Sequence, residues 1–173
     1  KRYASGRERR GVLKNRTYIE KRPAIVDERI RIGDWEGDTV IGKAHQGALV
    51  TLVERKSRYT LARRVCGKHA SGVGEAIIEL LRPHKANCHT LTFDNGKEFA
   101  EHEFIARCLN ADVFFAHPYS SWERGLNENT NGLLRQYFPK GTNLLLVSQD
   151  EVNDAVYKLN HRPRKCLGYR TPH

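Results

Sequence analysis

The sequence contains no methionine, not even at position 1, and no long apolar run. A helix that crosses a membrane needs about 18 or more consecutive apolar residues, and no run in this chain approaches that length. The chain opens with KRYASGRERRG, a basic and polar segment that is unlike a secretory signal peptide. These absences argue against a membrane protein. They also lead us to expect a piece of a longer protein, with something lost upstream.

Cysteine is scarce, with four residues spread over the chain and no CxxC pair. Without paired spacing or a secretory signal, we expect reduced thiols and a cytoplasmic protein. The segment HKANCH places His84, Cys88 and His89 close together, which is half of a metal-binding pattern. Its second half is missing, so the sequence gives only weak support to a zinc site.

Acidic residues are outnumbered by basic ones, and the net charge is +10. Residues 1–29 contain ten Lys or Arg and four acids, so that +6 lies in this stretch and +4 in the rest of the chain. A basic arm on a basic domain favours a polyanionic partner, usually a nucleic acid. Solubility, or a linker that happens to be basic, is the simpler alternative.

Hydrophobic periodicity predicts an α/β domain over residues 31–173, preceded by a basic arm or linker at 1–30 that shows no clean period. Strands are expected at 34–42, twice within 47–65, at 89–94 and at 112–117. Helices are expected at 71–83, 97–111, 122–138 and 148–162, the last opening with a Ser148–Glu151 capping box. This order predicts a mixed five-stranded sheet with helices on both faces, as in ribonuclease H-like folds, although other α/β domains share it.

Two aspartates stand where an apolar strand would not need them. Asp94 ends the apolar stretch LTF and precedes Asn-Gly, which is typical of a turn but also of a site beyond a strand end. Asp38 lies in mid-strand and shares one strand face with Asp34 and Glu36. A solvent-facing edge would explain that acidic face. If helices cover both faces, a buried carboxylate there must be paired with a cationic side chain, bound to a metal or hydrated.

A third acid lies on the expected helix 122–138. At about 100° per residue, Leu133, Tyr137, Trp122 and Thr130 fall within about 40° of Leu126 and predict the stripe that faces the core. Glu128 falls on the opposite, polar face with Arg124, Asn131 and Arg135. A solvated Arg124–Glu128 pair, one helical turn apart, is the plain alternative.

Three segments carry a resemblance to a known family: GDWEGDTVIG, LTFDNGKEF and ERGLNENTNGLLRQYFPKG. They resemble the catalytic blocks of bacterial DDE transposases, specifically the insertion-sequence family numbered thirty. LNHRPRKCLGYRTP resembles the segment that closes the integrase core in such proteins. The resemblance implies that Asp38, Asp94 and Glu128 form a catalytic and metal-binding triad, with 33 residues between the last two. Glu123 leaves only 28 and does not match.

What the resemblance implies is metal-dependent DNA cleavage and strand transfer. Mg²⁺ or Mn²⁺, as a pair of ions, would activate the attacking oxygen and steady the leaving one. Element ends and target DNA are the expected partners, bound by a homodimer or higher assembly near the bacterial nucleoid. We expect Arg124, Asn131 and Arg135 to contact that DNA. A hydrolytic nuclease of the same fold, or a DNA-binding or assembly module without chemistry, is the alternative.

Overall fold

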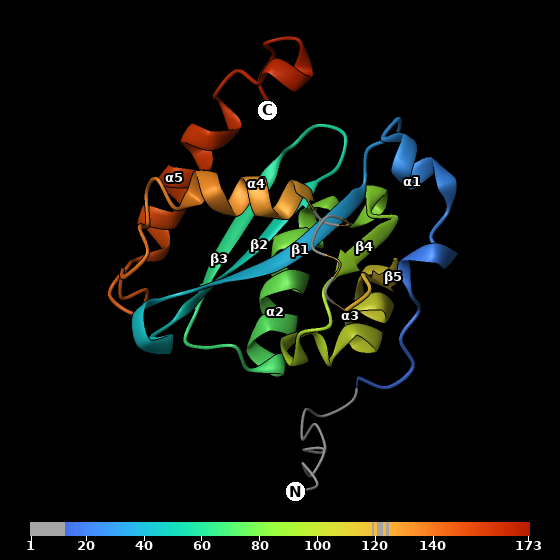
Figure 1. Cartoon of the computed structure of the whole chain (residues 1–173), viewed down its shortest axis with the longest axis horizontal. Coiled ribbons are helices and arrows are strands. Elements are labelled where there is room, and N and C mark those ends of the chain that lie inside the picture. Colours follow the sequence, from blue (N-terminus) through green and yellow to red (C-terminus); the bar gives the residue numbers. More distant parts are fainter. Residues whose placement is uncertain (1–12, 119, 121–122, 124) are drawn as a thin grey trace, which may run out of the picture.

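Five strands form one sheet in a computed structural model that describes residues 13–118, 120, 123 and 125–173. The strand order is β3-β2-β1-β4-β5, with β1 in the centre (Figure 1). β1 pairs antiparallel with β2 and parallel with β4, while β2–β3 is antiparallel and β4–β5 parallel. The strands span Asp34–Ile41 (β1), Ala48–Glu54 (β2), Thr60–Val65 (β3), Thr90–Phe93 (β4) and Asp112–Phe115 (β5). The predicted mixed five-stranded sheet is confirmed.

Helices cover both faces of this sheet, as predicted. Figure 1 shows α4 crossing in front of the strands and α2 and α3 behind them. The α-helices span Ala24–Glu28 (α1), Ala70–Leu81 (α2), His102–Leu109 (α3), Gly125–Leu134 (α4) and Gln149–Asn160 (α5). Short 3-10 turns lie at Ile19–Lys21 (η1), Lys43–His45 (η2), Arg82–Asn87 (η3), Lys97–Phe99 (η4) and Lys165–Leu167 (η6). In the described part of the chain, none of these helices has the length and apolarity to span a membrane.

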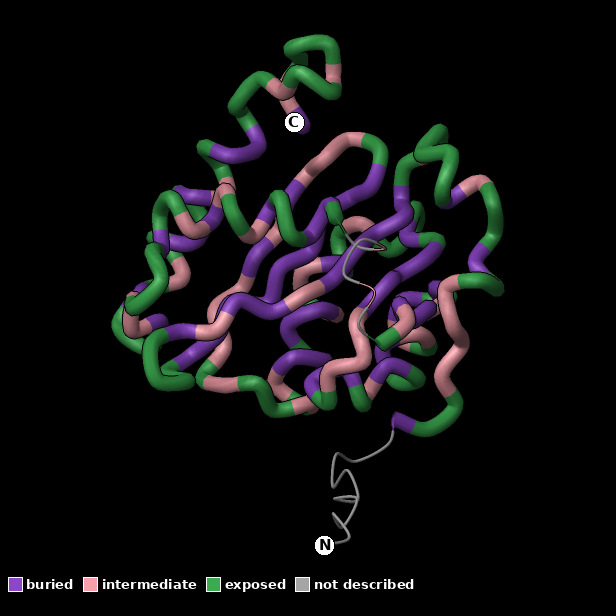
Figure 2. The backbone as a smooth tube through the Cα atoms, in the orientation of Figure 1, coloured by how far each residue is buried: buried purple, intermediate pink, exposed green. Residues whose placement is uncertain are grey.

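Each sheet face has its own apolar core, because β2 and most of β1 are buried on both sides (Figure 2). The larger core lies under α2 and α3, where the rings of Phe93 and Phe99 stack with centroids 4.4 Å apart. The smaller core joins Val40 and Leu49 of the sheet to Val152 and Ala155 of α5. A buried helical face and a strand buried on both sides stabilise each other through the apolar area they remove from water.

Local signals place the last helix well and two others less well. Ser148 caps α5, with its hydroxyl accepting from the Glu151 backbone N–H and the Glu151 carboxylate accepting from the Ser148 N–H, which confirms the capping box. The expected helix 97–111 is divided into η4 and α3, because Phe99 turns into the core. The expected helix 71–83 ends at Leu81, two residues before Pro83, which lies in the first turn of η3, where its missing N–H is not needed.

Residues 13–30 belong to the stretch 1–30 that the sequence assigned to an arm or linker, and they pack on the domain. Residues 1–12 of that stretch lie outside the described residues. Leu13 joins the larger core, and Tyr18 pairs with Phe115 at the edge of β5. Arg22 is buried: it donates to the Thr92 hydroxyl at 3.0 Å and forms an ion pair with Asp27. Arg22 of this segment is therefore an interior residue, which charge counting alone does not reveal.

Candidate active site

Asp38 and Asp94 reach the same region from two neighbouring parallel strands. The β1–β4 register pairs Glu36 with Thr92, and continuing it by two residues would set Asp38 of β1 opposite Asp94, which follows the end of β4. Gly37 makes this approach possible, because a Cβ there would lie 2.4 Å from Cε1 of Phe93. The Asp38 carboxylate faces the α4 side of the sheet, because it contacts Asn131 of that helix.

Asp38 is held from both of its oxygens. Its Oδ1 accepts from the Thr39 backbone N–H at 2.8 Å, and its Oδ2 accepts from Nδ2 of Asn131 at 2.9 Å. The Thr51 hydroxyl, on the β2 residue paired with Asp38, donates to Oδ1 of Asn131 at 3.1 Å. The amide of Asn131 thus links the carboxylate to the next strand and fixes the orientation of Asp38.

Asp94 is a turn residue at the end of β4 and also belongs to the candidate site. Its Oδ1 accepts from the Gly96 backbone N–H at 2.9 Å, which stops β4 immediately after Phe93. The next side chain, Asn95, donates to the carbonyl of Ala116 just beyond β5. The loop that presents Asp94 is therefore tied to the neighbouring strand, so the turn and the site interpretations are compatible.

Glu128 lies on α4, three residues before Asn131, and is exposed. The structure thus places it one helical turn from the residue that holds Asp38. Among the described residues, however, no group of three His, Cys, Asp or Glu side chains is close enough to hold a metal ion. Asp38 on β1 and Asp94 just after β4 belong to neighbouring segments of the sheet, whereas Glu128 is exposed on α4 and the three carboxylates do not form one metal-binding group.

The face of α4 that packs on the sheet differs from the predicted one. Tyr137 lies beyond the helix end and is 36% exposed, and Leu133 is only half-buried. The buried residues of α4 are Leu126, Asn127, Thr130 and Leu134, and Trp122 lies outside the described residues. The sheet surface beneath α4 carries Glu36, Asp38 and Thr51, so a polar helix face fits it better than an apolar stripe.

The three residues expected to contact DNA have different surroundings. Asn131 turns to Asp38, as described above. Arg135 is half-buried and donates to two main-chain carbonyls, Ile41 at 2.9 Å and Phe138 at 3.4 Å, where β1 and the end of α4 meet. Arg124 lies outside the described residues. The guanidinium of Arg135 therefore holds α4 to the end of β1.

The other two acids on the Asp38 face of β1 are buried and have cationic partners. Asp34 accepts from Arg31 at 2.8 and 2.9 Å and from the Thr90 hydroxyl at 2.7 Å. Burial alone would raise the pKa of Asp34, but these hydrogen bonds outweigh it and lower that pKa. Glu36 is paired with Arg55, yet burial still raises its pKa. The acidic face is thus not a solvent-facing edge.

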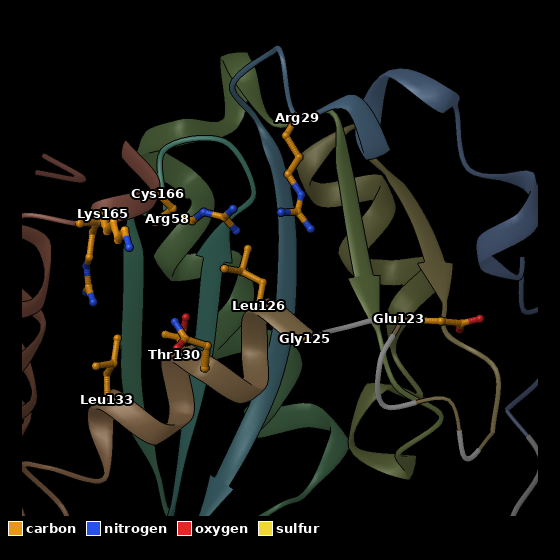
Figure 3. Close-up of a pocket in the computed structure, with 11 residues that line it drawn as sticks. Arg29, Arg58, Glu123, Gly125, Leu126, Thr130, Leu133, Lys165 and Cys166 are labelled. Carbon is orange, nitrogen blue, oxygen red and sulfur yellow. The ribbon is translucent and has the colours of Figure 1, made fainter. Parts of the chain in front are cut away.

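Glu123, which does not fit the family spacing, has a separate partner. Its carboxylate accepts from the His117 backbone N–H at 2.8 Å and lies 3.1 Å from Nδ1 of the same histidine. The hydrogen bond to Glu123, with its negative charge and that of Glu20, raises the pKa of His117. Figure 3 shows Glu123 pointing away from α4. Its position gives no reason to replace Glu128 in the expected triad.

The HKANCH segment forms no metal site in the described part of the chain. The His84 ring packs near Trp35 and Tyr59, with centroids 5.5 and 6.0 Å away. Cys88 is buried in the larger core, and that burial raises the pKa of its thiol to about 12. A buried, protonated thiol is a poor metal ligand, which agrees with a packing role.

Sequence comparison finds close relatives, although no family model matches the chain. Over 163 residues, or 94% of this chain, it is 48% identical to the transposase for insertion sequence element IS4351 of Bacteroides fragilis. It is 43% identical over 160 residues, 91% of the chain, to transposase InsI for insertion sequence element IS30C of Escherichia coli K12. These matches cover 50% and 41% of the two proteins, so the chain spans about half the length of the curated relatives it matches, or less.

Solved structures with the same fold are viral integrase cores. The catalytic core domain of BIV integrase has a TM-score of 0.62 and 21% sequence identity with this chain. The match covers 80% of this chain and 89% of the integrase domain. The HTLV-2 integrase catalytic core domain, solved in complex with magnesium in a trimeric form, matches 82% and 94% with a TM-score of 0.62 at 20% identity. The chain is thus a homologue of insertion-sequence transposases, those of IS30 among them, with the ribonuclease H-like fold of an integrase catalytic core.

Proposed function

We propose that this chain is the catalytic core of a DNA transposase. It cuts DNA at the ends of a mobile element and joins the freed 3′-hydroxyl to target DNA, which is the chemistry of transposition, DNA integration and recombination. The observation that supports the proposal is the parallel β1–β4 register, because two residues beyond its Glu36–Thr92 pair it brings Asp94 beside Asp38. The naming of the relatives as transposases supports it.

The donor set fits a divalent metal. Carboxylate oxygens are the ligands that Mg²⁺ prefers, and Asp38 and Asp94 supply them from the central part of the sheet, on β1 and just after β4. Asp38, Asp94 and Glu128 would hold Mg²⁺ or Mn²⁺, as one ion or a pair. Bound ions would activate the attacking oxygen and neutralise charge on the phosphoryl group. The assignment of Glu128 as a metal ligand rests on the third motif, since its carboxylate does not form a three-residue metal-binding group with Asp38 and Asp94 in the structure.

The chain's own residues set the geometry around these ligands. Asn131 and the Thr39 N–H keep both oxygens of Asp38 oriented, and the Gly96 N–H does the same for one oxygen of Asp94. Such hydrogen bonds preserve the orientation of the ligating oxygens. DNA is the proposed partner of this edge, and a homodimer or higher assembly of the chain would bring together two element ends.

A cleavage and joining assay with element-end duplexes and Mg²⁺ tests the proposal. Asp38→Asn, Asp94→Asn and Glu128→Gln should each abolish cutting and joining, because each removes a metal ligand and leaves the basic surface in place. DNA binding in the absence of metal should be nearly unchanged. Glu123→Gln is the matched control for Glu128→Gln, since it makes the same change in the same motif.

Several outcomes would contradict the proposal. An active Asp38→Asn together with an inactive Asp34→Asn would show that the wrong residue was chosen on β1. Full activity in all three variants would remove the metal-dependent mechanism. Cut strands without any joined product, across a range of target DNAs, would favour the hydrolytic nuclease instead.

A further inference from the structure

A basic pocket of about 500 Å³ lies on the flank of α4 that faces away from Glu128. Its walls come from α4, from the β2–β3 turn, from the end of α1 and from the segment around η6 (Figure 3). Leu126, Thr130 and Leu133 line it from the helix. At about 100° per residue, the centre of this flank is roughly 150° around α4 from Glu128. The pocket is thus separate from the candidate active site that contains Asp38 and Asp94.

Four cationic side chains line the pocket: Arg29, Arg58, Arg164 and Lys165. Figure 3 shows the guanidinium groups of Arg29 and Arg58 directed into the space above Leu126. Among the described lining residues, the acid is Glu123, which points away and is bound to His117. The pocket therefore concentrates positive charge from segments that are far apart in the sequence.

Arg58 and Arg164 are half-buried in the pocket wall, whereas Arg29 and Lys165 are exposed. Partial burial and the nearby Arg58 lower the pKa of Arg29, and partial burial and Arg162 lower that of Arg164. The Nε atoms of Arg58 and Arg164 are buried and have no hydrogen-bond partner among the described residues. Mutual repulsion and unpaired buried N–H donors both cost free energy, and an anion in the pocket would remove both costs.

We propose that this pocket binds a phosphate group of the DNA backbone, at a point away from the strand being cut. A guanidinium pairs with phosphate oxygens through two N–H groups, and Lys165 adds a point charge. Gly125, at the N-terminus of α4, lines the same pocket, so the positive end of that helix faces the ligand. The assignment of the phosphate to DNA rests on the proposed function. The pocket itself is argued from its geometry.

Two exposed cysteines provide a footprint of this pocket in the unaltered chain. Cys166 lines it, while Cys66 lies beyond the end of β3 in a different hollow. The alkylation rate of each thiol by iodoacetamide would be followed by mass spectrometry in EDTA, so that no DNA is cut. A DNA duplex should slow alkylation of Cys166 and leave Cys66 unchanged. Inorganic phosphate is the comparison ligand.

The second measurement is the salt dependence of DNA binding by the Arg58→Gln, Lys165→Gln double variant. Loss of the one phosphate contact should make the dependence of log K on log salt less steep by about 0.9. Lys85→Gln, Arg107→Gln is the matched control, because both residues are exposed on the α2–α3 side of the sheet and their loss changes net charge equally. The control should keep the slope of the unaltered chain.

Each result decides the question. Protection of Cys166 by DNA with the lower slope supports the proposal. Protection by inorganic phosphate alone would overturn the assignment to DNA, and no protection with an unchanged slope would overturn the site. Cleavage by the unaltered chain is measured separately in Mg²⁺. If the unaltered chain cuts DNA but the double variant keeps the same salt dependence, only this pocket is refuted. If the double variant has the weaker salt dependence but the unaltered chain never cuts DNA, only the transposase function is refuted.

Discussion

At the scale of single residues, Asn131 has a role that its charge-neutral side chain does not suggest. The amide accepts from Thr51 and donates to Asp38, so it connects β2, β1 and α4 at one carboxylate. A hydrogen-bond donor directed at a metal-binding carboxylate fixes which oxygens remain for the ion. Asn131 therefore acts as a positioning residue in the proposed site, while its contact with DNA stays a prediction.

We predict that Asn131→Ala weakens metal use without unfolding the chain. The variant should need roughly 10–100-fold more Mg²⁺ for half-maximal cleavage, since partners of metal ligands have effects of that size. High Mg²⁺ should restore part of the rate. Cleavage titrations in Mg²⁺, with a urea unfolding curve for each protein, make the measurement. Asn153→Ala, at an exposed position of α5, is the control, and an equal Mg²⁺ requirement in both variants would refute the role.

At the scale of elements, α4 illustrates how a helix can pack through a polar face. Leu134 is fully buried, and Asn127 and Thr130 are nearly so, whereas the neighbouring Leu133 is half-buried. The contact with Asp38 and the Arg135 bonds to main-chain carbonyls set the rotation of the helix about its axis. That rotation places Glu128 on one flank and the basic pocket on the other.

The rotation of α4 predicts unequal effects of two adjacent leucines. Leu134→Ala should lower the free energy of unfolding by about 2–5 kcal/mol, because it leaves a cavity in a closed core. Leu133→Ala removes the same atoms from a half-buried position and should cost about 1 kcal/mol or less. Urea unfolding at constant m-value compares the two. If Leu133→Ala lowered the free energy of unfolding more than Leu134→Ala, the core-facing side of α4 would be the one that the sequence predicted.

At the scale of the whole molecule, an excess of positive charge coexists with buried acids. Asp34, Glu36 and Glu98 are buried, and each accepts a hydrogen bond or ion pair from a basic residue. Arg22 and Arg55 both contact Asp27, so the same kind of pairing attaches residues 13–30 to the sheet. Part of the basic charge thus contributes to folding rather than to the binding of a polyanion.

The lowered pKa of Asp34 predicts how global stability depends on pH. Its ordinary value is 3.8, and the folded value is lower because Arg31 and Thr90 bind the charged form. The stabilisation is therefore complete above about pH 4 and is lost as the pH falls through the folded pKa. Asp34→Asn should reduce stability at pH 7 and make the loss between pH 5 and pH 2 shallower, as followed by urea unfolding.

The matched control for this measurement is Asp112→Asn, which removes one carboxylate from an exposed position of β5. If Asp34→Asn changed the pH dependence no more than this control, the hydrogen bonds to Arg31 and Thr90 would not be its cause.

Local sequence signals determined much of this protein. The strands, most of the helices, the capping box at Ser148 and the order that gives a mixed sheet all follow from periodicity and turn residues over a few positions. The placement of Asp94 at a strand end is equally local. The three motifs indicated the relatives and the fold, both of which comparison bears out, while the triad itself stays a prediction.

Only the tertiary structure decided which polar groups meet. No periodicity indicates that Asn131 binds Asp38, that Arg135 holds the end of β1, or that residues 13–30 pack on the sheet. The same is true of the basic pocket, whose cations come from separate segments. The physical reason is that hydrogen bonds and ion pairs depend on atoms brought within a few ångströms by the whole fold, whereas hydrophobic periodicity reports only which side of an element is buried.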